Sequence, residues 1–80
     1  MRSISQIINL VVDGEIATPE QAAALVCEEG REAAAFYNIP VVQAVSNVLE
    51  GIDLAIDRMA SPLAEKFLLL FSPITKKEND

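Results

Sequence analysis

Apolar residues recur at intervals of three and four along nearly the whole chain, and this spacing restricts the fold to helices. The clearest run places its apolar residues on one helix face: Val41, Val45, Val48, Ile52, Ala55 and Met59. That face is widened by Val42, Leu49 and Ile56, which makes it too broad for a two-stranded coiled-coil seam. No segment alternates apolar and polar residues as a half-buried strand does. The pattern therefore predicts an all-α bundle of three to four helices.

Proline and glycine mark where the first two helices begin and end. A helix over residues 3–13 is expected to stop at Asp13-Gly14, because Gly tolerates the left-handed conformation of a helix end. Thr18-Pro19-Glu20-Gln21 combines a capping box with a proline suited to the first helical position. A second helix is therefore predicted over residues 19–37.

Gly30 lies in the middle of this second helix, where it can break the helix or let another backbone approach closely. We favour a continuous helix, because the strong helix formers Ala33, Ala34 and Ala35 follow. Asn38-Ile39-Pro40 then predicts a corner, since Pro40 disfavours helical geometry at the residue before it.

The second half of the chain divides in the same way. The third helix is expected to run from the corner to about Ala60, and Ser61-Pro62 begins a fourth helix over residues 62–71. Ser72-Pro73 is expected to end it. We predict one helical domain over residues 1–73 and a disordered, charged tail over residues 74–80.

The amount of apolar side chain indicates that the protein associates with something. Hydrophobic residues make up 51% of only 80 residues, and a domain of this size buries about 60% of the surface that its unfolded chain exposes. So much apolar surface is expected to exceed what one chain can bury. We therefore expect a homodimer, or a complex with another protein.

Composition also excludes several functions. The formal net charge is -6, and the six Lys and Arg residues are scattered, so no basic surface for nucleic acid is expected. With no His and a single Cys, the chain lacks the usual residues of zinc sites and of His-based catalysis. We expect no catalytic residue, no metal and no cofactor, and therefore no enzymatic activity.

Cys27 is expected to be a small buried hydrophobe, and a lone thiol suits a reducing cytoplasm. No run of apolar residues is long enough for a membrane span.

Three carboxylates form an acidic ridge on the third predicted helix. Glu50, Asp53 and Asp57 share one helix face, and Ser46 lies one turn before Glu50 on the same side. The ridge is either a solvated face opposite the buried stripe or a docking edge for Arg and Lys of a partner. It is poorly suited to acid–base catalysis, because nothing nearby would raise the pKa of an exposed carboxyl.

The segment Ser46-Asn47-Val48-Leu49-Glu50-Gly51 resembles the inhibitory motif of Fic-domain antitoxins, which is Ser or Thr, three residues, Glu, then Gly or Asn. The resemblance implies that the motif helix docks beside the ATP site of an AMP-transferring enzyme. Glu50 would then obstruct the γ-phosphate of the nucleotide, with Ser46 as its helical neighbour.

A second segment resembles the theta subunit of bacterial DNA polymerase III and its phage relatives. In that family a Gly precedes Tyr-Asn-Met-Pro-Val by seven residues, as Gly30 precedes Tyr37-Asn38-Ile39-Pro40-Val41 here. This resemblance implies a small three-helix protein that binds the proofreading exonuclease subunit.

Near the C-terminus, Phe67, Leu70 and Phe71 form an apolar patch. The patch is either part of the core or an anchor for an interface, and among apolar residues it is the best candidate for dimerisation. Taken together, the sequence predicts a small acidic protein that binds another protein as an inhibitor or adaptor, of the kind carried by bacteria, plasmids or phages. A purely structural homo-oligomer and a protein that sequesters a small ligand remain as alternatives.

Overall fold

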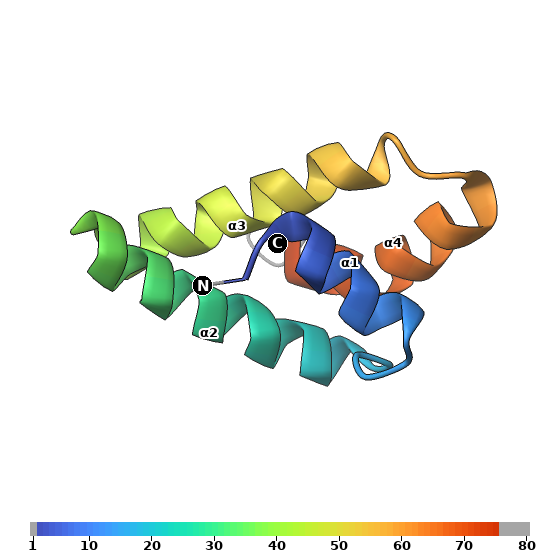
Figure 1. Ribbon diagram of the computed structural model, residues 1–80, viewed down its shortest axis with the longest axis horizontal. Helices are drawn as coiled ribbons and strands as arrows, with labels where there is room; N and C mark the ends of the chain where they lie inside the picture. The colour runs from blue at the N-terminus through green and yellow to red at the C-terminus, as the bar shows by residue number, and fades with distance from the viewer. Residues whose placement is uncertain (1, 76–80) are drawn as a thin grey trace.

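The computed structural model describes residues 2–75, and within them it contains helices and no strand. The helices follow in the order α1 (Ile4–Val12), α2 (Pro19–Tyr37), α3 (Val41–Ile56) and α4 (Ser61–Thr75). The chain turns by 118° between α2 and α3, so these two helices form a V. Figure 1 shows that α2 and α3 meet at one end, and that α1 and α4 lie towards the open end of the V. The predicted all-α bundle is confirmed.

Side-chain caps fix the starts of α1 and α2. The hydroxyl of Thr18 accepts the backbone N–H of Gln21, and Oε1 of Gln21 accepts the backbone N–H of Thr18, both at 3.2 Å. This is the capping box that the sequence predicted, with Pro19 at the first helical position. Ser3 and Gln6 form a second capping box at the start of α1, which the sequence analysis did not identify.

Two residues with positive φ turn the chain between helices. Gly14 has a φ of 85° and follows α1, as predicted from its tolerance of this conformation. Asn38 has a φ of 56° and caps the C-terminus of α2, where its backbone N–H donates to the carbonyl of Ala34. Asn is the residue that most readily replaces Gly at such a position. The predicted corner at residues 38–40 is therefore confirmed.

Helix α2 is continuous through Gly30, as predicted, and this glycine lets α2 and α3 approach each other closely. A Cβ atom built on Gly30 would overlap Cγ2 of Val45, and would lie 3.2 Å from its Cα atom and 3.3 Å from its backbone nitrogen. Small side chains continue this close approach towards the corner. They form a separate cluster of Ala33, Ala34 and Ala44, with Ile39 packed against it.

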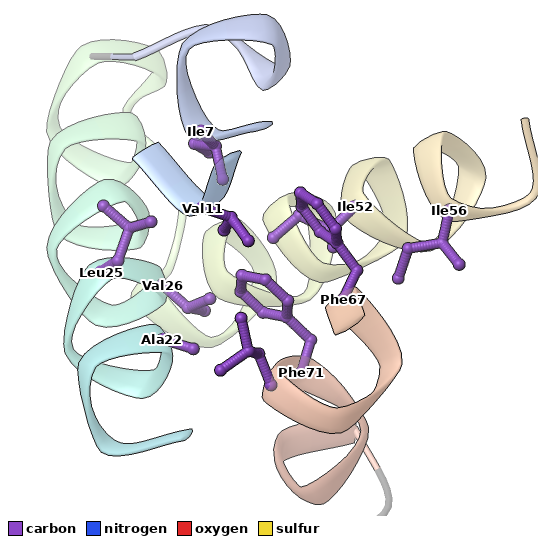
Figure 2. Close-up of a cluster of buried hydrophobic side chains, with 10 residues drawn as sticks. Ile7, Val11, Ala22, Leu25, Val26, Ile52, Ile56, Phe67 and Phe71 are labelled. Carbon is purple, nitrogen blue, oxygen red and sulfur yellow. The ribbon is translucent and has the colours of Figure 1, made fainter. Parts of the chain in front are cut away.

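The main core fills the V where α1 and α4 enter it. Its buried residues come from all four helices: Ile7, Val11, Ala22, Leu25, Val26, Ile52, Ile56, Phe67, Leu70 and Phe71. Figure 2 shows Phe67 and Phe71 projecting from α4 towards the residues of the other helices. Their rings are nearly parallel, with centroids 5.9 Å apart. Phe67 and Phe71 are each 1% exposed and Leu70 is 5% exposed in the single chain. The expectation that these three residues form an apolar interface is therefore corrected: they are core.

Two predicted helix ends also differ from the structure. Helix α3 ends at Ile56 rather than near Ala60, because its last turn tightens and the N–H groups of Arg58 and Met59 donate three residues back. The chain then reverses towards α4.

Helix α4 continues through Pro73 to Thr75, although Ser72-Pro73 was expected to end it. Pro73 cannot donate to the carbonyl of Leu69, but both residues are exposed, so water can bind that carbonyl instead. The helix therefore extends two residues beyond the domain boundary predicted at residue 73. The rest of the predicted tail, residues 76–80, lies outside the described residues.

A buried glutamate attaches the segment before α1 to α2. Glu29 is 1% exposed, and its Oε1 accepts the backbone N–H of Arg2 at 2.7 Å. Its Oε2 accepts Nη1 of Arg2, also at 2.7 Å, and the same nitrogen donates to the exposed Glu28 at 3.1 Å. Hydrogen bonds to Glu29 and then to Glu28 raise the pKa of Arg2 above its ordinary value. The guanidinium therefore stays charged and compensates the buried carboxylate.

We expect Glu29→Gln to lower the free energy of unfolding by about 1 kcal/mol, because the neutral amide keeps the bond to the Arg2 backbone and loses the charge-assisted one. Urea denaturation followed by circular dichroism measures the change. Glu28→Gln is the matched control, since that side chain is 57% exposed and contacts the same Arg2 nitrogen. Equal effects of the two substitutions would contradict the role assigned to Glu29.

Candidate protein-binding surface

Four large apolar side chains are exposed around the corner between α2 and α3. Phe36 is 73% exposed, Tyr37 58%, Val41 49% and Val42 82%. We call these four residues the apex patch. They lie at the point of the V, where the colour in Figure 1 is green, at the end away from α1 and α4.

Phe36 and Val41 are exposed because two apolar helix faces continue beyond the elements that cover them. Phe36 lies at helical spacing from Leu25 and Glu29, so it occupies the side of α2 that contacts the segment before α1. That segment reaches Glu29 and Glu28 and leaves the last turns of α2 uncovered. Val41 likewise begins the stripe that continues as Val45 and enters the core.

The two aromatic rings of the apex patch contact each other. The centroids of Phe36 and Tyr37 lie 4.9 Å apart, and the ring planes are at 88°, an edge-to-face arrangement. The two rings therefore contact each other although both residues are exposed. Aromatic residues in a defined orientation are enriched where proteins bind one another, since little conformational entropy is lost on binding.

The predicted acidic ridge lies on the outward face of α3. Ser46, Glu50 and Asp53 are exposed, and so is Asp57, which caps the C-terminus of the helix. Between residues 2 and 75, no Lys or Arg forms an ion pair with any of the three carboxylates. The structure therefore brings these residues together on one accessible surface. Gly51 faces inward instead, where a Cβ atom would lie 3.1 Å from Cδ1 of Ile4.

Other candidate residues are scattered. Leu68 and Leu69 are exposed on α4 and line a shallow groove with Glu65 and Ser72. Cys27 is exposed, which corrects the prediction that it is a buried hydrophobe. Cys27 directly follows the buried Val26, and a step of one residue along the helix turns its side chain to the outer face of α2.

Within residues 2–75, no group of three or more His, Cys, Asp or Glu residues is placed to hold a metal ion. A cleft of mixed polar and apolar lining lies between the α1–α2 loop and α2, with charged residues such as Arg2, Arg31 and Glu15 beside apolar ones such as Leu10 and Ile16. In the same part of the chain, no single helix has the length and apolar character needed to cross a membrane. Helices α2 and α3 pass that test only when taken together, across their 118° bend.

Neither the apex patch nor the buried Glu29 was predicted from the sequence. The signal for the patch was present, because the apolar stripe of α3 extends to the first residue after the corner and two aromatic residues precede it. Glu29 also had a signal, since it lies at helical spacing from the buried residues Ala22, Val26 and Ala33.

Comparison with models of protein families, with curated proteins and with solved structures finds no match to this chain. The resemblances to Fic-domain antitoxins and to the theta subunit are therefore neither confirmed nor refuted, and the roles they imply for Ser46, Glu50 and Gly51 remain predictions.

Proposed function

We propose that this chain acts by binding another protein, as an inhibitor or adaptor, and that the apex patch is its principal contact. The proposal depends on one observation, the exposure of Phe36, Tyr37, Val41 and Val42 around a single corner. Residues on the apolar face of a helix are normally covered, and at Phe36 and Val41 both helices extend past their cover.

The size of the patch supports this role. The four side chains together expose on the order of 400 Å² of largely apolar surface, since one aromatic side chain accounts for about 150–250 Å² when fully exposed. The largest apolar patch of a typical monomer covers about 300–600 Å² and is often functional. A standard interface buries about 800 Å² on each partner, so the apex patch would form the centre of an interface rather than all of it.

From the sequence, Phe67, Leu70 and Phe71 were either part of the core or the best candidate for an interface, and their burial moves the proposed contact to another part of the molecule. Among residues 2–75, four of the eight large apolar residues that are exposed lie together at the corner, and the other four are Val12, Leu54, Leu68 and Leu69. A structural homo-oligomer would use the same patch on two copies, whereas a ligand-sequestering protein would need an enclosed pocket.

The test compares what the full chain and an apex variant bind. Phe36→Ser should reduce capture of a specific partner by about tenfold or more, because buried aromatic residues at the centre of an interface each contribute at least ~1.4 kcal/mol. Capture from lysate with quantitative mass spectrometry measures the ratio. Leu69→Ser, which removes a comparably exposed side chain from α4, is the control and should leave capture unchanged.

Two results would count against the proposal. One is capture of the same proteins in the same amounts by wild type and Phe36→Ser. The other is a stable oligomer in light scattering that captures nothing, which would favour the structural alternative. Thermal stabilisation by a nucleotide or metabolite, unaffected by Phe36→Ser, would instead favour ligand sequestration.

A further inference from the structure

We infer that the partner is a protein that presents a basic amphipathic helix, which lies along the outward face of α3 with its apolar end on the apex patch. This inference rests on the proposed function and adds the chemistry of the partner to it. The apolar contact comes first, since Val42 is both part of the apex patch and the first exposed residue on this face of α3.

The path along α3 is set by helical spacing. Ser46 lies one turn after Val42, and Asp53 lies two turns after Ser46 on the same line. Glu50 and Asp57 flank that line, and the exposed Leu54 lies beside them. From Val42 to Asp57 the face is about 22 Å long at about 1.5 Å per residue. A partner helix of about four turns would match it.

Charge complementarity determines the chemistry of the occupant. Helix α3 contains no Lys or Arg, and Glu50, Asp53 and Asp57 have no cationic partner among residues 2–75. A second copy would place like charges against this face and would add a second net charge of -6 to the complex. A basic helix would instead pair with all three carboxylates while its apolar residues cover the apex patch.

The experiment measures binding of two synthetic helices to the full chain by isothermal titration calorimetry. One is an 18-residue peptide (about 27 Å when helical) whose contacting face carries leucine in the first turns, to cover the apex patch, and lysine in the turns that follow. The second has the same pattern with glutamate in place of lysine. We expect the lysine peptide to bind and the glutamate peptide to bind at least tenfold more weakly.

Three variants separate the contributions. The triple variant Glu50→Gln, Asp53→Asn and Asp57→Asn should weaken binding of the lysine peptide about tenfold. This is the loss of affinity expected when three exposed ion pairs are removed together. Val42→Ser should weaken it by a similar factor, because an apolar anchor is lost. The control variant changes the exposed Glu15, Glu20 and Glu65 to Gln. It alters net charge equally and should leave binding within twofold.

Each contrary outcome has a distinct meaning. Equal binding of both peptides, or unchanged binding by the triple variant, overturns the inference that the partner is basic. In that case the proposed function survives if Val42→Ser still weakens binding. Should Val42→Ser change binding of neither peptide, the apex patch is not a docking site and the proposed function fails with it. A molar mass in light scattering of twice one chain, reduced by Val42→Ser, shows that a second copy occupies the patch and also overturns the inference.

Discussion

Phe67→Ala is expected to lower the free energy of unfolding by about 4 kcal/mol, the typical cost of truncating a fully buried Phe. Phe67 is 1% exposed and stacks against Phe71, so the substitution removes apolar burial, leaves a cavity among four helices and breaks the ring contact. The total stability of a domain of this length is about 4–12 kcal/mol, so this one change removes a large part of it. Urea denaturation followed at 222 nm measures the loss.

Leu69→Ala on the same helix is the matched control, since Leu69 is 74% exposed and its truncation should change stability by less than about 0.5 kcal/mol. Where Phe67→Ala fails to fold, Phe67→Leu provides a milder test with an expected loss of about 1.5 kcal/mol. A small effect of Phe67→Ala on unfolding, combined with a change of molar mass in light scattering, would restore the interface role that the sequence suggested.

Gly30→Ala is expected to lower the free energy of unfolding by about 2 kcal/mol, although alanine favours a helix by about 1 kcal/mol over glycine. The new methyl group would overlap Cγ2 of Val45 and press on its backbone, with its Cα atom at 3.2 Å and its nitrogen at 3.3 Å. A side chain can rotate away, but the backbone of Val45 can move only if α3 moves as a whole. Thermal and chemical denaturation of the variant measure the cost.

Gly51→Ala tests the same substitution without the backbone contact. A Cβ atom there would lie 3.1 Å from Cδ1 of Ile4, the end of a flexible side chain that can shift. The gain in helix propensity should therefore dominate, and stability should stay the same or rise by up to about 1 kcal/mol. If both alanine variants were stabilised equally, the close approach of α2 and α3 at Gly30 would be disproved.

The candidate surface could be predicted only in part. Helical spacing was sufficient to place Glu50, Asp53 and Asp57 on one exposed face, because that property depends on local geometry alone. The same spacing assigns Val41 and Ile52 to one face without saying which is covered. In the structure Ile52 is 2% exposed and Val41 is 49% exposed, since α1 and α4 pack only towards the open end of the V.

Local chemistry determined the helices and most of their ends. Capping boxes, the proline at residue 19 and the positive φ of Gly14 and Asn38 depend on neighbouring residues, so they can be read from the sequence. Tertiary structure decided which apolar residues are core and which are surface. That choice depends on where helices far apart in the sequence cross, as Gly30 and Val45 do, and on how far each covering helix extends. Phe67 and Phe36 are equally apolar, and only the arrangement of α1 and α4 in the V buries the first and exposes the second.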